Sequence, residues 1–283
     1  MKQFILTGAP DSDGLIRLEG NDYHYLVHVR RLAVGEFFPA VLSGREETLA
    51  QVVSVGKNFL TVKYSLAESK EEADSMADSR ADSCRLILFQ ALPKGDKMDL
   101  IVRQAAESGI AEIVPFVSEF SIAKTGAAGQ KFSRWERIIK EARQQSGSRT
   151  ATMLHKPLTM SGLFDYWKKI SGNGALPEAL GLLFHHDGNY VLSEKAGQKG
   201  LEHKSLHGYL NINPKIAAFA IGPEGGFSDK EVSLFSENSF MPFTIGKNIL
   251  RTETAALYCA AAIRIILLER DEWNLSKTRS DNE

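Results

Sequence analysis

The first 64 residues alternate between short apolar stretches and turn residues. Several β-type alternations lie between Phe4 and Tyr64, among them LIRL, GEFFPAVLSG and TLAQVVSVGKNFLTVKY. Gly56 to Asn58 interrupts the last of these, which predicts a hairpin turn. Apolar residues at helical spacing predict one helix from Asp22 to Leu32. We therefore expect a small β-rich domain at this end of the chain.

Residues 67–83 differ sharply in composition from the residues before them. They carry six acidic and two basic side chains and almost nothing apolar. Such a segment buries too little apolar surface to offset the entropy lost on ordering. We interpret it as an acidic linker between two domains.

After the linker, apolar runs of strand length alternate with amphipathic stretches of helix length. RLILFQAL and AEIVPFVS are typical of buried strands, and MDLIVRQAAESG between them predicts a helix ending at Gly109. SRWERIIKEARQQSG predicts a second helix, GLLFHH and KIAAFAIG two further strands, and TETAALYCAAAIRIILLER a long final helix. Strands that alternate with helices predict an α/β fold around a parallel sheet.

Composition bears on the partners, the cysteine chemistry and the location expected for the protein. The 34 basic and 35 acidic side chains nearly cancel, so overall charge identifies no polyanionic partner. Cys84 and Cys259 lie outside any CxxC spacing, which argues against a disulfide framework or a zinc ribbon. No signal peptide and no run of roughly 18 apolar residues is present, which favours a soluble cytoplasmic protein.

The sharpest local signal is IAAFAIGPEGGFSDKEVSLF, a strand that runs directly into Gly-Pro-Glu-Gly-Gly and then into a helix. Glycines allow positive φ and close approach of backbone amides to a ligand. Open α/β sheets bind small molecules at the carboxyl ends of their strands. A tight strand-to-helix connection without a ligand fits the same spacing equally well.

Three acidic or hydroxyl side chains near this turn have different expected roles. Ser228 and Glu231 have the spacing of a capping box, so a structural role is favoured for both. Glu224 has no helix to cap, and we expect it to bind a ligand hydroxyl or a cationic partner. The chain has no GxxxxGK[ST] motif, and Gly172-Asn173-Gly174 follows no strand, so neither ATP nor NAD is expected.

GPEGGFSDKE followed by TIGKNILRTETAALYCAAAI resembles the signature pair of the small-subunit (16S) ribosomal RNA (uracil-N3)-methyltransferases, within the SPOUT class of knotted methyltransferases. HYLVHVRRLAVGE resembles the PUA-like domain of that family, ALPKGDKMDLIVRQAAESGIAEIVPFVSE the start of its catalytic domain, and EARQQSGSR its basic helix end. The resemblance covers most of the chain. Phe120 and Gln104 stand where the family usually has Arg and Lys, and Ser108-Gly109 replaces a Leu-Gly pair.

The resemblance implies a PUA-like β-barrel over residues 1–66, a SPOUT domain with a trefoil knot over 84–275, and a polar tail over 276–283. It also implies a homodimer, built in part by the C-terminal helix, with S-adenosyl-L-methionine bound in the knot and no metal. The implied cofactor residues come from one strand end and two loops: His185, Ile221, Gly222, Glu224, Gly225, Gly226, Ile245, Gly246, Ile249, Leu250, Arg251 and Thr252. His186 is a further candidate for the pocket rim.

The implied reaction in ribosomal RNA processing is methylation of the N3 atom of a specific uridine in 16S ribosomal RNA. N3 carries a proton between two carbonyls, so its anion is the nucleophile, and a fixed cation would stabilise that charge. Arg251 is the catalytic candidate, although a surface arginine paired with Glu253 or Glu224 fits equally well. Alternatives are a SPOUT enzyme for ribose 2′-hydroxyls or transfer RNA, and a non-catalytic RNA-binding assembly factor.

Local charge favours contact with RNA. Residues 124–156 hold eight basic and two acidic side chains, a net charge of +6, although a solvated helix face would show the same pattern. The expected RNA contacts are His24, Arg30, Arg31, Lys94, Lys97, Arg134, Arg137, Arg143 and Arg149. The pairs His24/His28 and His203/His207 lack a third ligand at motif spacing, so no metal site is expected.

Overall fold

The structure is a computed structural model, and it describes residues 3–6, 8–42, 47–64, 84–122, 125–172, 178–185 and 205–280. The chain divides into two compact units, one formed by residues 1–72 and 140–151 and the other by residues 73–139 and 152–283. The sequence gives no sign that residues 140–151 group with the first unit. The interpretation of 67–83 as a linker, and those of Lys124, His186 and His203, fall on residues outside the described ranges, and the predicted domain bounds stay predictions.

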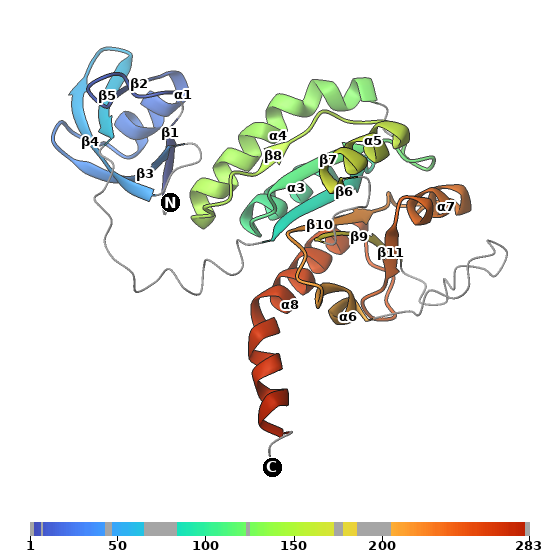
Figure 1. The fold of residues 1–283 in the computed structure, drawn as a ribbon. Coiled ribbons are helices and arrows are strands. Elements are labelled where there is room, and N and C mark those ends of the chain that lie inside the picture. The colour runs from blue at the N-terminus through green and yellow to red at the C-terminus, as the bar shows by residue number, and fades with distance from the viewer. Residues whose placement is uncertain are drawn as a thin grey trace. The chain divides into compact units, whose positions relative to one another are not determined.

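The first unit is built on a five-stranded sheet in the order β1-β3-β4-β5-β2. Its strands are β1 (Phe4–Leu6), β2 (Leu15–Glu19), β3 (Phe37–Leu42), β4 (Glu47–Val55) and β5 (Phe59–Tyr64). β1 runs parallel to β3, and the other neighbours are antiparallel. The sheet curls around a core that includes Phe4, Phe38 and Leu60 (Figure 1). The predicted hairpin turn is confirmed, because Gly56 N donates to Phe59 O between β4 and β5.

The helix expected from Asp22 to Leu32 begins earlier and is of a different type. It consists of α1 (Gly20–Tyr23) and a π-helix, η1 (His24–Val29), in which Arg30 N donates to Tyr25 O. Arg31 has a φ of 57°, a left-handed conformation that is uncommon for non-glycine residues and stops the helix before Leu32. The predicted end at Leu32 is therefore wrong.

The second unit contains a six-stranded sheet in the order β11-β9-β10-β6-β7-β8, with every neighbouring pair parallel. This confirms the α/β class. The strands are β6 (Arg85–Ala91), β7 (Glu112–Phe116), β8 (Met153–Leu154), β9 (Ala179–Phe184), β10 (Ile216–Ile221) and β11 (Phe240–Phe243). The four central strands match apolar runs in the sequence, whereas the short edge strands β8 and β11 were not predicted.

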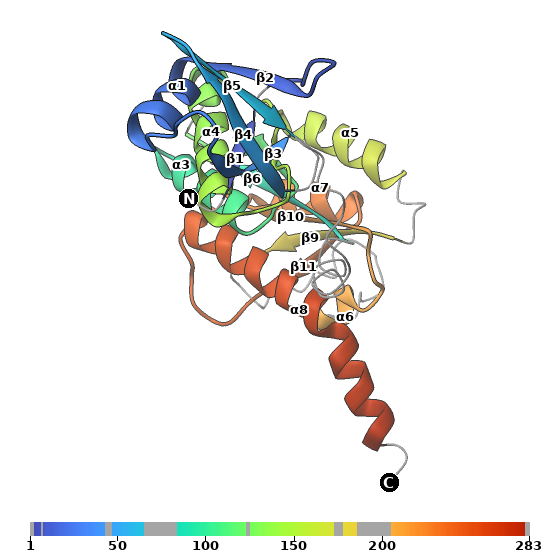
Figure 2. The ribbon, with the colours of Figure 1, turned by 90° about the vertical axis from the view of Figure 1, so that its left-hand side faces the viewer.

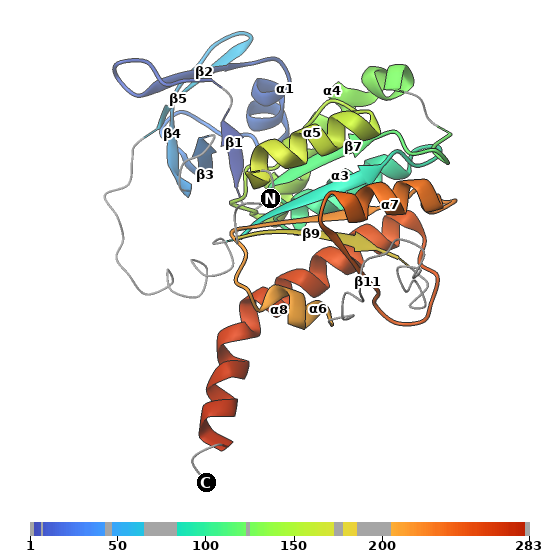
Figure 3. The same cartoon turned by 45° about the vertical axis from the view of Figure 1, so that its right-hand side comes forward.

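Helices cover both faces of this sheet, as Figures 2 and 3 show. α5 and α7 bury Phe89 and Ala218 on one face, and α3 and α8 pack over Leu88 on the other. The helices of this unit are α3 (Lys97–Glu107), α5 (Met160–Ser171), α6 (Leu206–Leu210), α7 (Asp229–Glu237) and α8 (Thr252–Ser280). α4 (Thr125–Ser146) begins in this unit, and its residues from Lys140 on belong to the first. His207 lies in α6. Among the described helices, none has the length and apolarity of a membrane span.

The N-terminus of α7 has the predicted capping box. Ser228 Oγ accepts from Glu231 N, and the Glu231 carboxylate accepts from Ser228 N. The same carboxylate also accepts hydrogen bonds from Glu119 N at 2.8 Å and from Ser118 Oγ at 3.1 Å. Glu231 therefore caps α7 and also holds the turn after β7 against the start of this helix. Its structural role is broader than the predicted capping.

The chain crosses the carboxyl edge of the sheet between β11 and α8. β11 pairs with β9 at one edge, whereas Thr252, the first residue of α8, lies beside Gln90 of β6. Residues 244–251 therefore pass over the ends of β9 and β10, because these two strands separate β11 from β6. The trefoil knot implied by the resemblance stays a prediction.

Candidate cofactor-binding site

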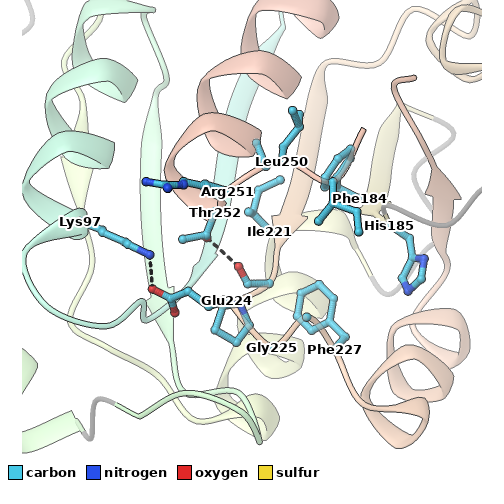
Figure 4. Close-up of a pocket in the computed structure, with 15 residues that line it drawn as sticks. Lys97, Phe184, His185, Ile221, Glu224, Gly225, Phe227, Leu250, Arg251 and Thr252 are labelled. Carbon is cyan, nitrogen blue, oxygen red and sulfur yellow. Dashed lines mark hydrogen bonds and ion pairs between the residues drawn. The ribbon is translucent and has the colours of Figure 1, made fainter. Parts of the chain in front are cut away.

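A pocket of about 520 Å³ opens at the carboxyl ends of β9 and β10, where parallel sheets bind ligands. Its volume lies within the range of roughly 300 to 1,000 Å³ that is usual for small-molecule sites. The pocket is lined by Lys97, Phe184, His185, Ile221, Gly222, Pro223, Glu224, Gly225, Gly226, Phe227, Ile249, Leu250, Arg251, Thr252 and Ala255 (Figure 4). Two loops, 222–227 and 249–252, supply most of its wall.

The first loop is a tight turn that depends on its glycines. Gly226 N donates to Pro223 O at 2.9 Å, and Gly226 has a φ of 73°, which L side chains rarely adopt. A Cβ added to Gly222 would lie 3.2 Å from the carbonyl carbon of Gly226. A side chain at Gly222 would therefore be too close to the backbone of Gly226 unless the turn shifted, and the turn lines the pocket largely with backbone.

Hydrogen bonds through one threonine join the second loop to the first. Thr252 Oγ1 donates to Gly222 O at 2.7 Å and accepts from Gln90 Nε2 at 3.0 Å. Gln90 is fully buried at the end of β6, so the start of α8 is held against the ends of β6 and β10. Next to this anchor, Ile249 is 79% exposed although it is apolar. An apolar side chain left open on a pocket wall is typical of a surface that a ligand covers.

Glu224 and Lys97 form the polar corner of the pocket. Lys97 Nζ lies 2.6 Å from Glu224 Oε1 and 3.8 Å from Glu253 Oε2. The backbone N–H of Lys94 donates to the Glu224 carboxylate at 3.1 Å and 3.3 Å. The expectation that Glu224 binds a cationic partner is thereby confirmed, as the Lys97–Glu224 pair in Figure 4 shows. The hydrogen bond from Lys94 also ties the loop before α3 to the glycine turn.

The surroundings of Glu224 keep its carboxyl group ionised. Burial raises the pKa of Glu224, but hydrogen bonds from Lys97 and from the backbone of Glu224 and Lys94, together with the charge of Lys97, outweigh it. The pKa therefore lies below its usual value of 4.5. Because folding lowers the pKa of Glu224, the ion pair is intact above the usual value of 4.5. It is lost only as the pH falls through the lowered pKa.

We expect Glu224→Gln and Lys97→Met each to weaken binding of S-adenosylmethionine by about 10-fold, since each removes a charge-assisted hydrogen bond that holds the turn. The loss in the double variant should be smaller than the sum of the two single losses, because both changes break the Lys97–Glu224 contact. Titration calorimetry at neutral pH measures the three dissociation constants. In the unmodified protein, the Lys97–Glu224 pair should support cofactor binding equally well after acidification to about pH 5, because Glu224 stays ionised.

Lys131→Met is the matched control, because Lys131 Nζ lies 2.7 Å from Asp96, a distance similar to that in the Lys97–Glu224 pair, and the Lys131–Asp96 pair lies outside the pocket. That variant should bind the cofactor normally. Fully additive effects of Glu224→Gln and Lys97→Met would show that loss of the Lys97–Glu224 ion pair is not what weakens cofactor binding.

Arg251 is an exposed cation on the pocket wall. In Figure 4 its side chain extends from the start of α8 towards the side where Lys97 lies. The structure contradicts the alternative in which Arg251 pairs with Glu253 or Glu224. Both carboxylates lie within ion-pair distance of Lys97, and neither pairs with Arg251. Within the described part of the chain, Arg251 forms no ion pair, so its guanidinium is available to a substrate.

Most of the expected cofactor residues meet in this pocket, but two do not. Ile245 and Gly246 are absent from the described lining. Gly246 has a φ of 77°, and its carbonyl accepts from Thr244 Oγ1 at 3.2 Å, so it forms a local turn before the loop that lines the pocket. Lys97, expected on an RNA surface, lines the pocket instead. Phe184, Pro223, Phe227 and Ala255 were missed. Pro223, Phe227 and Ala255 lie inside the two motifs and Phe184 precedes His185, which is the one signal that could have indicated them.

The basic stretch around α4 carries less unpaired charge than the sequence suggests. Arg134 pairs with Asp99 at 2.5 Å and Lys140 with Asp22 at 2.9 Å, in addition to Lys131 with Asp96. Arg143 is only 7% exposed, and burial lowers the pKa of its guanidinium. Contrary to expectation, Arg143 therefore does not face solvent, where a phosphate could reach it.

The remaining expected RNA contacts are exposed. On and after η1, His24, Arg30 and Arg31 all face solvent, and the rings of His24 and His28 lie 5.2 Å apart. Lys94, Arg137 and Arg149 are exposed as well. No cluster of three or more His, Cys, Asp or Glu side chains placed to hold a metal occurs in the described ranges.

Comparison with protein families decides the class. A family described as RNA methyltransferase domain matches residues 80–264, and one described as RNA methyltransferase PUA domain matches residues 18–64. This chain belongs to the RNA methyltransferase family. The first match covers the glycine turn and Arg251, and the second covers most of the five-stranded sheet, as expected for a PUA-like domain.

Relatives of this RNA methyltransferase span nearly its full length. Ribosomal RNA small subunit methyltransferase E 2 of Borreliella burgdorferi is 27% identical over 270 residues, which cover 94% of this chain and 98% of the relative. Ribosomal RNA small subunit methyltransferase E of Synechocystis is 29% identical over 268 residues, covering 93% and 78%.

Solved structures share the fold of this RNA methyltransferase. A putative methyltransferase from Legionella pneumophila, in complex with bound SAM, has a TM-score of 0.70 and 25% identity over 93% of this chain and 97% of that one. A ribosomal RNA small subunit methyltransferase E from Neisseria gonorrhoeae bound to S-adenosyl methionine has a TM-score of 0.68 and 22% identity, covering 94% and 98%.

Proposed function

We propose that this RNA methyltransferase transfers the methyl group of S-adenosylmethionine to N3 of a specific uridine in 16S ribosomal RNA. The observation that carries the proposal is the pocket between the glycine turn and residues 249–252, with Arg251 on its wall. The names of the relatives support the small ribosomal subunit as substrate, and the two cofactor-bound neighbours support the donor. The choice of N3 as the methylated atom is based on the resemblance of the two C-terminal motifs.

The pocket residues fit S-adenosylmethionine. Ile221, Ile249 and Leu250 offer apolar contacts for an adenine ring, and the close-packed turn from Gly222 to Gly226 offers backbone groups for its edge. Glu224 and Thr252 are polar groups at the same wall. When bound, the cofactor supplies a methyl group that its sulfonium already activates, so the chain mainly has to orient the acceptor and exclude water.

Arg251 would act on the acceptor base. Negative charge develops on uracil as N3 loses its proton, and a guanidinium fixed beside the base stabilises that charge. Arg251 suits this role because it has no carboxylate partner among the described residues and lies at the pocket wall. N3 is on the Watson–Crick edge, so the target uridine must be unpaired or flipped out before it can reach Arg251.

We further propose that the enzyme is a cytoplasmic homodimer and that the PUA-like domain contacts the RNA. α8 leaves Leu257, Tyr258, Ile265 and Leu268 between 37% and 51% exposed, and a second copy could cover this apolar face. In the first unit, the exposed His24, Arg30 and Arg31 supply the positive charge that phosphates require.

The decisive experiment incubates the protein with isotopically labelled S-adenosylmethionine and small ribosomal subunits that lack the modification. Mass spectrometry of the digested RNA should identify labelled 3-methyluridine as the product. A labelled 2′-O-methyl nucleoside would instead support the ribose-directed alternative. Cofactor binding by calorimetry without any labelled nucleoside would contradict catalysis on this substrate, and absence of binding heat would favour the assembly factor.

A further inference from the structure

An exposed aromatic ring stands at the edge of the cofactor turn. Phe120, in the turn after β7, is 47% exposed, and Ile122 close by is 70% exposed. A Cβ added to Gly225 would lie 3.0 Å from Phe120 Cβ and 3.4 Å from Phe120 Cγ, so the ring begins directly beside the turn. Burial of this ring would be favourable, which makes it a surface ready for a planar apolar partner.

The turn that carries Phe120 is held in place by buried hydrogen bonds. Ser118 Oγ and Glu119 N both donate to the carboxylate of Glu231, which is 5% exposed. Ser121 closes the turn, because its N–H donates to Ser118 O at 3.0 Å and its Oγ accepts from Ser118 N at 3.2 Å. The backbone of Phe120 is therefore fixed before any ligand arrives, which lowers the entropy lost on binding.

A second loop contacts the same turn through its backbone. Gly225 touches Phe120, and the preceding residue, Glu224, accepts a hydrogen bond from the backbone N–H of Lys94. The side chain of Lys94 is exposed. Two adjacent residues of the turn, Glu224 and Gly225, thus lie beside the backbone of Lys94, whose side chain is exposed, and beside an exposed aromatic ring. A nucleotide has the matching chemistry, since it joins a flat base to a phosphate.

We propose that Phe120 stacks on an unpaired nucleobase of the RNA substrate and that Lys94 pairs with a phosphate of the same strand. The rim of the pocket would then hold the single-stranded stretch from which the target uridine enters. This inference rests on the proposed function and adds the mode of substrate recognition to it. Splayed bases stacked on aromatic side chains are the usual way in which proteins hold single-stranded RNA.

The test compares Phe120→Leu with Phe120→Trp on unmodified small ribosomal subunits. Phe120→Leu should raise KM for the subunits by about 10-fold, the loss expected when one base no longer stacks, and Phe120→Trp should restore it. The dissociation constant of S-adenosylmethionine, measured by calorimetry, should stay the same in both variants. Lys94→Gln should lower the slope of log KM against log salt concentration by about one.

Ile212→Ala is the matched control, because Ile212 is a 53% exposed apolar side chain that does not line the pocket. It should change neither KM nor cofactor affinity. If Phe120→Leu leaves KM unchanged, or weakens cofactor binding instead, the ring only braces Gly225 and the proposal is wrong.

A second readout separates this proposal from the proposed function. Tryptophan emission of Phe120→Trp should be quenched by single-stranded oligouridine even where no methyl transfer is measured. Quenching without any methylated product would overturn the proposed function and keep the stacking surface. Methyl transfer without quenching, and with normal KM in Phe120→Leu, would overturn the stacking surface alone.

Discussion

Replacement of Arg251 by alanine is expected to lower the yield of methylated nucleoside by about 100- to 1,000-fold, as for the loss of one preorganised group that stabilises developing charge. Arg251 is exposed and has no ion-pair partner among the described residues, so its removal leaves no buried charge behind. Stability and cofactor affinity should therefore change little. Single-turnover rates with labelled cofactor, calorimetry and thermal unfolding measure the three quantities.

Two further variants make the Arg251 result specific. Arg103→Ala removes an exposed arginine from α3, outside the pocket, and should leave the rate unchanged. Arg251→Lys keeps the charge but loses the planar fork, so we expect partial activity. Normal turnover by Arg251→Ala would remove this residue from the mechanism.

The parts of the fold that the sequence predicted are those with strong local periodicity. β6, β7, β9 and β10 are near-continuous apolar runs, as strands buried on both faces require, and each was expected. The capping box at Ser228 and Glu231 was also expected, because its two members lie three residues apart. Signals of this kind depend on neighbours in the chain and not on how strands are ordered.

Contacts between distant loops could not be predicted in the same way. Lys97 and Glu224 are 127 residues apart, and Gln90 and Thr252 are 162 apart. They meet only because β6 and β10 are neighbours in the sheet and because residues 244–251 cross its edge. A pattern of apolar positions gives strand identity but not strand order, so Lys97 was assigned to an RNA surface and its ion pair was missed.

Local charge was a weaker guide than local hydrophobicity. The stretch with a net charge of +6 was expected to face phosphate, yet Asp96, Asp99 and Asp22 from other elements neutralise part of it. The carboxylates lie far from α4 in sequence, so a count along the chain does not include them. The π-helix η1 was missed for a related reason, since helical spacing of apolar residues does not separate π from α geometry.

Substitution of Gly222 is expected to weaken cofactor binding through the shape of the turn. A Cβ at this position would lie 3.2 Å and 3.3 Å from backbone atoms of Gly226 and 3.4 Å from the Phe227 ring. Backbone atoms cannot rotate away as a side chain can, so the backbone of the turn must shift by a few tenths of an ångström to make room. We expect Gly222→Ala to weaken binding of S-adenosylmethionine by about 10-fold and Gly222→Val by about 100-fold, a graded response to overpacking.

Gly162→Ala provides the control for Gly222, because a Cβ there would meet its nearest atom, Thr159 Oγ1, only at 3.4 Å. Gly162 lies in the first turn of α5, where alanine favours the helix by about 1 kcal/mol, so this variant should unfold at the same or a higher temperature. Its cofactor affinity should be unchanged. Equal cofactor affinity in Gly222→Val and in the unmodified protein would show that the turn does not form the binding wall.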